Sequence, residues 1–161
     1  MRRLLPLFLL LVLSACAQHT PLPETPPTLQ LPLQLHVQRE QAGQTQDWLL
    51  VIQQEGAALR WSLMDPMGIP VARQLLTAQQ WQNDGLLPPN PEARELFAAL
   101  LFALTPAEQV PAHYPGAYWQ QHGAQRWLRD GDETRWQVIY QQPENFQLKT
   151  QAADYRVEML P

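Results

Sequence analysis

The stretch LRWSLMDPMG, residues 59–68, joins a strand pattern to a tight turn. Its first five residues alternate between apolar and polar side chains, as they do in a strand with one buried face. Asp65, Pro66 and Gly68 then occupy positions that these residue types favour in a type I turn. Met67 therefore lies at the tip, where water gives no reason for a flexible apolar side chain. The stretch predicts one half of a β-hairpin, and its tip either presents Met67 to solvent or folds it back over the hairpin.

The segments on both sides of this hairpin continue an antiparallel pattern. Further strands are predicted at residues 31–37, 48–52, 71–76, 125–129, 135–140, 146–150 and 155–160. A helix is expected between the two groups of strands, because Asn90 is a good N-cap, Pro91 suits the first helical position, and apolar residues follow helical spacing over 93–104. Residues 105–108 (TPAE) have the form of a capping box and predict a second, short helix. This order favours an α+β fold, with one curved antiparallel sheet wrapped around helices.

The beginning of the chain has the features of a secretory leader. Arg2 and Arg3 precede an apolar run at residues 4–13, which is too short for a membrane span of about 20 residues. LSAC, residues 13–16, resembles the lipobox of bacterial lipoprotein precursors, in which the cysteine is acylated. The alternative is an ordinary signal peptide that leaves Cys16, the only cysteine of the chain, unpaired. In Gram-negative lipoproteins an Asp after the cysteine usually signals inner-membrane retention, so with Ala17 the resemblance implies the outer membrane.

Three regions follow from this interpretation. Residues 1–15 are expected to be a lipoprotein signal peptide, residues 16–30 the lipidated cysteine with a proline-rich spacer, and residues 31–161 a single domain. The prolines of the spacer favour an extended polyproline II conformation, which would hold the domain away from the lipid anchor.

The charge of the chain argues against binding to nucleic acid. The formal net charge is −4, and loss of Arg2 and Arg3 with the leader takes it to −6. Lys149 is the only lysine, and no segment concentrates basic residues. Nucleic-acid binding needs a clustered basic footprint, and so does electrostatic docking on anionic lipid. We therefore expect no nucleic-acid partner.

The sequence shows no catalytic or metal-binding constellation. None of the four histidines has a short metal-binding spacing to cysteine or carboxylate residues. Ser62 is the only serine after the leader, and it lacks the Gly-x-Ser-x-Gly setting of a nucleophile elbow. Asp130, Asp132 and Glu133 crowd a turn at Gly131, where a solvated turn is favoured over a calcium site. The protein is expected to be no enzyme and to hold no cofactor or metal.

Large apolar residues of the expected strands and helix point to a common interior. The residues that could line it are Trp48, Leu50, Trp61, Leu63, Phe97, Leu101, Trp136 and Val138. Such a face is usually a close-packed core. A curved sheet closed by a movable helix can also enclose a cavity for an acyl chain. Both interpretations fit the sequence.

The order of these features resembles that of LolB, the outer-membrane lipoprotein that receives other lipoproteins from their periplasmic carrier. Residues 59–68 look like its strand and Pro-Leu-Gly turn, and residues 135–140 (RWQVIY) are similar to its late aromatic strand. The mature chain also resembles an uncharacterised family of short predicted lipoproteins thought to be LolB-like, some of them encoded with aryl-polyene lipid genes. The proline-rich segment takes the place of an amphipathic helix that LolB has before its first strand.

The resemblance implies a half-open β-barrel of the LolA/LolB type, with an apolar cavity and a helical lid inserted between strands. Met67, between Pro66 and Gly68, takes the place of the protruding Leu that helps to transfer lipid-bearing cargo into the membrane. The implied partners are membrane lipid through acylated Cys16, lipid or lipidated cargo, and a periplasmic lipoprotein carrier. The protein would act on the periplasmic face of the outer membrane. The alternative function is a non-catalytic scaffold lipoprotein that binds protein partners through a solid domain.

Overall fold

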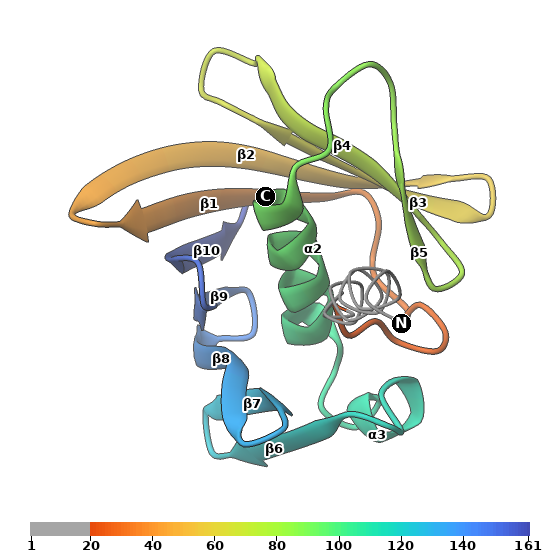
Figure 1. Cartoon of the computed structure of the whole chain (residues 1–161), viewed down its shortest axis with the longest axis vertical. Coiled ribbons are helices and arrows are strands. Elements are labelled where there is room, and N and C mark those ends of the chain that lie inside the picture. The colour runs from red at the N-terminus through yellow and green to blue at the C-terminus, as the bar shows by residue number, and fades with distance from the viewer. Residues whose placement is uncertain (1–19) are drawn as a thin grey trace, which may run out of the picture.

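Ten antiparallel strands form one continuous curved sheet in the computed structural model of the protein, which describes residues 20–161 (Figure 1). In chain order the strands are β1 (Leu33–Gln41), β2 (Gln44–Glu55), β3 (Ala58–Met64), β4 (Pro70–Thr77), β5 (Gln80–Asn83), β6 (Tyr118–His122), β7 (Gln125–Asp130), β8 (Glu133–Gln142), β9 (Asn145–Lys149) and β10 (Asp154–Met159). Two helices lie between β5 and β6, namely α2 (Pro91–Leu104) and α3 (Val110–His113). The predicted leader, Cys16 and Ala17 lie outside the described residues.

The sheet consists of two meanders joined along one pair of strands. The strand order is β5-β4-β3-β2-β1-β10-β9-β8-β7-β6, so strands that follow each other in the chain are paired within β1–β5 and within β6–β10, and β1 pairs with β10. That pair is antiparallel and runs from Leu35 opposite Met159 to Glu40 opposite Asp154. The edge strands β5 and β6 do not pair, and α2 lies on the concave side of the sheet (Figure 1). The predicted curved antiparallel sheet around a helix is therefore confirmed, in the form of a half-open barrel.

The core lies between the concave face of the sheet and α2. Successive side chains of a strand point to opposite faces, so alternate residues reach this core. In β3, for example, the buried Trp61 and Leu63 alternate with the partly exposed Arg60 and Ser62. Helix α2 is enclosed on nearly all sides, which explains why its apolar residues are not confined to one stripe. Its buried residues are Ala93, Leu96, Phe97, Ala98, Ala99, Leu100, Leu101, Phe102 and Ala103.

Helix α2 begins and ends where the sequence predicts, but the residues after it do not cap the second helix as predicted. The Asn90 side chain accepts a hydrogen bond of 3.0 Å from the Ala93 amide, and a proline occupies the first turn. The predicted capping box at residues 105–108 is wrong, because the Thr105 hydroxyl donates to the Leu101 carbonyl (2.7 Å) and closes the C-terminus of α2. Helix α3 starts further on without a side-chain cap.

The structure also contains two strands that the sequence does not indicate, β5 and β6. Both are short and rich in glutamine, with the sequences QWQN and YWQQH. They are the two edges of the sheet. An edge strand has one side without a partner strand and is largely exposed, so it needs no apolar alternation that a sequence pattern could reveal.

Residues 20–32 form neither helix nor strand, and they lie at the open side of the half-barrel between β5 and α3 (Figure 1). The Glu24 amide donates a hydrogen bond of 2.8 Å to the His113 carbonyl at the end of α3. The leucines of this segment that pack against the core are Leu22, Leu29 and Leu31. The described part of the expected spacer thus lies against the domain, because its leucine side chains pack against the core.

Candidate functional site

The turn between β3 and β4 presents two large apolar side chains to solvent. Met67 is 84% exposed and Ile69 is 61% exposed, so Met67 does not fold back over the hairpin. Asp65 holds the turn, because its carbonyl accepts from the Gly68 amide (2.9 Å) and its carboxylate accepts from the amides of Met67 (2.9 Å) and Ile69 (2.8 Å). Gly68 has φ +79°, a conformation that favours glycine. The tip is therefore apolar and conformationally well defined. Sequence reasoning singled out Met67 and Pro66 but missed Ile69.

Charged and polar contacts attach the N-terminal half of α2 to one side of the sheet. Glu95 accepts hydrogen bonds from two guanidinium nitrogens of Arg135 (2.8 Å each) and from the indole nitrogen of Trp136 (2.6 Å), both on β8. Near the start of the helix, Glu92 pairs with Arg39 of β1 (3.2 Å to Nη2). Burial alone raises the pKa of the Glu95 carboxyl, but the hydrogen bonds from Arg135 and Trp136 outweigh it, so this pKa lies below its usual value.

The C-terminal end of α2 is attached to the same side of the sheet. The last carbonyls of a helix have no partner within it. Here Arg126 of β7 donates to the carbonyls of Phe102 (2.9 Å) and Thr105 (2.7 Å), and the Tyr140 hydroxyl of β8 donates to the Ala103 carbonyl (2.7 Å). Both ends of α2 are thus held by buried or partly buried polar groups of the sheet.

The opposite side of α2 meets strands β3, β4 and β5, which we call the wing, through aromatic rings. The ring centroid of Phe97 lies 5.4 Å from that of Trp61 and 5.8 Å from that of Trp81, and the two indoles are 5.6 Å apart in an edge-to-face arrangement. Among the described residues, the hydrogen bonds between α2 and the sheet go to β1, β7, β8 and β10, and none goes to the wing. The contact between α2 and the wing is therefore apolar and non-directional.

The inner face of the wing also contains buried polar atoms that lack a protein partner. These atoms are Gln74 Oε1, Trp61 Nε1 and Trp81 Nε1. Gln74 is 1% exposed and lies directly across from Trp61 in the β3–β4 pair. The buried indole of Trp136 on β8, by contrast, donates to Glu95. Most buried polar groups in proteins have partners, so these unpaired atoms are unusual. Gln109, Tyr114 and Arg129 have such atoms elsewhere in the described residues. Sequence reasoning missed Gln74 and Trp81, although a glutamine at an inward position of β4 is a readable signal once the register is known.

The structure brings the residues predicted to line a cavity together in one core, to which α2 contributes Phe97 and Leu101 and the strands contribute the others. Seven of them are fully buried, namely Leu50, Trp61, Leu63, Phe97, Leu101, Trp136 and Val138. Trp48 is half-buried, 6.5 Å from the Tyr155 ring. Three surface hollows can be described within residues 20–161, and none of them is lined by these eight residues. In this conformation α2 fills the concave face, so a bound acyl chain requires α2 and the sheet to separate.

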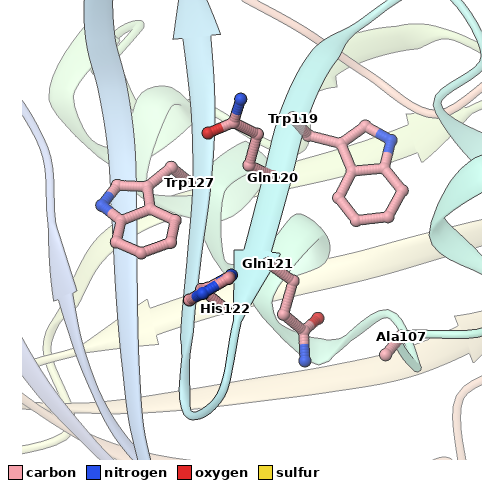
Figure 2. Close-up of a pocket in the computed structure, with 6 residues that line it drawn as sticks. All are labelled: Ala107, Trp119, Gln120, Gln121, His122 and Trp127. Atoms are coloured by element: carbon pink, nitrogen blue, oxygen red, sulfur yellow. The ribbon is translucent and has the colours of Figure 1, made fainter.

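An open hollow surrounds the free edge of β6 (Figure 2). Its lining residues are Ala107, Trp119, Gln120, Gln121, His122 and Trp127. Gln120 and Gln121 project to opposite sides of the strand in Figure 2, as neighbours in a strand do, so the hollow wraps around the edge and does not enter the core. β6 and the wing lie at opposite edges of the sheet. This hollow is therefore separate from the apolar tip at Met67.

Two further properties of the described residues bear on function. Residues 20–161 contain no group of three or more His, Cys, Asp or Glu side chains placed to hold a metal ion. Neither α2 nor α3 has the length and hydropathy that a membrane-crossing helix needs.

Comparison with known proteins identifies a family for nearly the whole described domain. A family model described as "Protein of unknown function (DUF3261)" matches residues 32–160. The match includes all ten strands and both helices of the half-barrel. A search of curated proteins finds no match to the chain.

Proposed function

This chain belongs to the DUF3261 family of proteins of unknown function, and we propose that it is a lipoprotein that binds or transfers lipid or lipidated cargo. Acylated Cys16 would anchor it on the periplasmic face of the outer membrane. The turn with Met67 and Ile69 would meet the membrane or a periplasmic lipoprotein carrier, and an acyl chain would enter between α2 and the wing. The observation that carries the proposal is the exposed apolar pair on a turn held by Asp65.

The tip is suited to contact with lipid because its apolar side chains are exposed before any partner arrives. Full burial of one such side chain contributes about 1.5–3 kcal/mol. Asp65 already accepts hydrogen bonds from the amides of Met67, Gly68 and Ile69, so docking orders little additional backbone. Met is unbranched and adapts to irregular apolar surroundings such as acyl chains. Similarity to the LolB turn supports the same role for Met67.

The distribution of contacts around α2 supports entry of the chain on the wing side. Ion pairs and hydrogen bonds hold α2 to β1, β7, β8 and β10, and breaking such buried contacts is costly. The contact on the wing side consists of the rings of Phe97, Trp61 and Trp81. The methylene groups of an acyl chain can replace these ring contacts without loss of a hydrogen bond between α2 and the wing. The wing can move as a unit, because Asp84 lies 2.9 Å from both Arg60 of β3 and Arg73 of β4. In this proposal α2 stays fixed and the wing opens.

A lipid-transfer assay tests the role of the tip. Fluorescent acyl lipid is followed as the protein moves it between donor and acceptor vesicles. The double variant Met67→Asp, Ile69→Asp should transfer lipid about tenfold more slowly or worse, because two carboxylates replace the side chains that enter the bilayer. Tyr118→Asp is the matched control, since Tyr118 is exposed on β6 at the other edge of the sheet. The control should keep the wild-type rate, and thermal unfolding should show both proteins folded.

Two results would contradict the proposal in different ways. If the double variant transferred lipid at the wild-type rate, Met67 and Ile69 would have no role in the transfer. A wild-type protein that transfers no lipid, and that carries none in native mass spectrometry after gentle purification from bacterial membranes, would refute lipid handling itself.

The close-packed interior favours a second candidate function, a non-catalytic scaffold that binds protein partners. Seven of the eight predicted cavity residues are fully buried against one another and α2, as in a solid domain. The scaffold hypothesis predicts a protein that co-purifies with the chain in defined stoichiometry. It also predicts that Met67→Asp leaves lipid transfer unchanged and weakens or spares the protein complex according to where the partner binds.

A further inference from the structure

Three side chains place unpaired polar atoms in an otherwise apolar face of the wing. Gln74 supplies an acceptor, Oε1, and the indoles of Trp61 and Trp81 supply N–H donors, all buried without a protein partner. Strand pairing sets Gln74 opposite Trp61, and it sets Trp81 opposite Leu76, the next inward residue of β4. Residues opposite each other in an antiparallel pair share a face and lie close together. The three polar groups thus form one patch facing Phe97 of α2.

The polar atoms of this patch form no hydrogen bond within the described residues. A buried donor or acceptor without a partner destabilises the folded state. Ala72 and Leu76 occupy the neighbouring inward positions of β4, so an apolar residue at position 74 would continue the pattern without that penalty. Arg94 adds another buried donor without a partner, Nε, one helical turn before Phe97 on the same side of α2. A bound molecule with complementary polar atoms would satisfy these groups.

Resting on the proposed lipid-binding function, we propose that Gln74, Trp61 and Trp81 bind the polar group of the acyl cargo, and that this group is an amide. An amide offers both kinds of atom that the patch requires, a carbonyl oxygen for the indole N–H donors and an N–H for Gln74 Oε1. A carboxylate supplies acceptors alone and leaves Gln74 Oε1 unpaired. A plain hydrocarbon satisfies none of the groups.

The position of Trp81 provides a route to this patch. Trp81 is partly exposed and belongs to β5, an edge strand of four residues that pairs only with β4. Because β5 is the free edge of the wing, movement of the whole wing away from α2 would open the patch past Trp81 while β5 stays paired with β4. The acyl chain would then lie along Phe97, with its amide against Gln74 and Trp61.

Competition between two ligands of equal chain length tests the proposal. Purified full-length protein is titrated with oleamide and with octadecene, and binding is followed by tryptophan fluorescence and native mass spectrometry. Wild type should bind oleamide about tenfold more tightly, as expected from one to two net hydrogen bonds. Gln74→Met removes the acceptor at similar volume and should abolish most of this preference while keeping octadecene affinity. Gln82→Met, at an exposed position of β5, is the matched control and should behave as wild type.

Each other outcome has a defined meaning. Equal affinity of wild type for oleamide and octadecene overturns the amide site and leaves lipid binding standing. Binding of neither ligand overturns lipid binding and the amide site together. An undiminished preference in Gln74→Met overturns the role of Gln74. This variant should unfold at the wild-type Tm or above it, because it removes a buried acceptor that has no partner in the folded protein. Oleate serves as the third ligand, and Gln74→Met should not weaken its binding.

Discussion

Removal of the Glu95 carboxylate should destabilise the fold by about 3 kcal/mol. The variant Glu95→Ala leaves the Trp136 indole N–H without its acceptor and removes both hydrogen bonds to Arg135. Breaking a buried ion pair by removing one partner costs about 3–5 kcal/mol. The lower end applies here, because the Glu95 side chain is 22% exposed and Asp130 still pairs with Arg135 at 3.0 Å.

Urea unfolding followed by tryptophan fluorescence measures this loss in the free energy of unfolding. Glu40→Ala is the matched control, since Glu40 pairs with Arg156 at 3.5 Å and both side chains are about half exposed. An exposed pair contributes only about 0–1 kcal/mol, so the control should stay close to wild type. Equal losses in the two variants, or a loss below about 1 kcal/mol for Glu95→Ala, would refute the reasoning that α2 is held through Glu95.

The same carboxylate should make stability depend on pH in a predictable direction. The pKa of Glu95 is lower in the folded protein than its usual value, so its contribution to stability is fully present above the unfolded pKa of about 4.3. The contribution is lost as pH falls through the folded pKa. Glu95→Gln cannot titrate, so the difference in unfolding free energy between wild type and Glu95→Gln should shrink below pH about 4. A difference that stays constant into strong acid would show that Glu95 is not a linked group.

Two further predictions concern the β3–β4 turn and the end of α2. Gly68→Ala should lower the free energy of unfolding by about 1 kcal/mol, because a side chain is strained at φ +79°, whereas Gly116→Ala should be neutral since that glycine has ordinary φ and open space around it. Arg126→Met should leave the carbonyls of Phe102 and Thr105 without their donor, and hydrogen exchange should then be faster in the last turn of α2 than in its first turn. Protection unchanged in that last turn would show that Arg126 does not anchor the helix.

Local patterns in the sequence were sufficient to predict the elements whose residues interact mainly with near neighbours in the chain. The turn at residues 65–68 depends on Asp65 and on a glycine with positive φ, both readable from the letters DPMG. The start of α2 depends on Asn90 three residues before the amide that it caps. Strand alternation around Trp61 and Leu63 likewise predicts the inward face, because side chains in a strand alternate regardless of the partner.

Other features depend on contacts between segments far apart in the chain, and only the tertiary structure decides them. The edge strands β5 and β6 are defined by pairing with β4 and β7, since apart from one partly buried tryptophan in each their residues are exposed. Glu95 becomes a buried anchor only because β8 brings Arg135 and Trp136 to it. Gln74 Oε1 is buried without a partner only because the β3–β4 pairing places Gln74 opposite Trp61 on the inner face of the sheet. The sequence by itself determined the strand periodicity, the tip at Met67 and the start of the helix, because these rest on local backbone geometry. Long-range packing decides which side of α2 is held by polar contacts and which side meets the wing through aromatic rings.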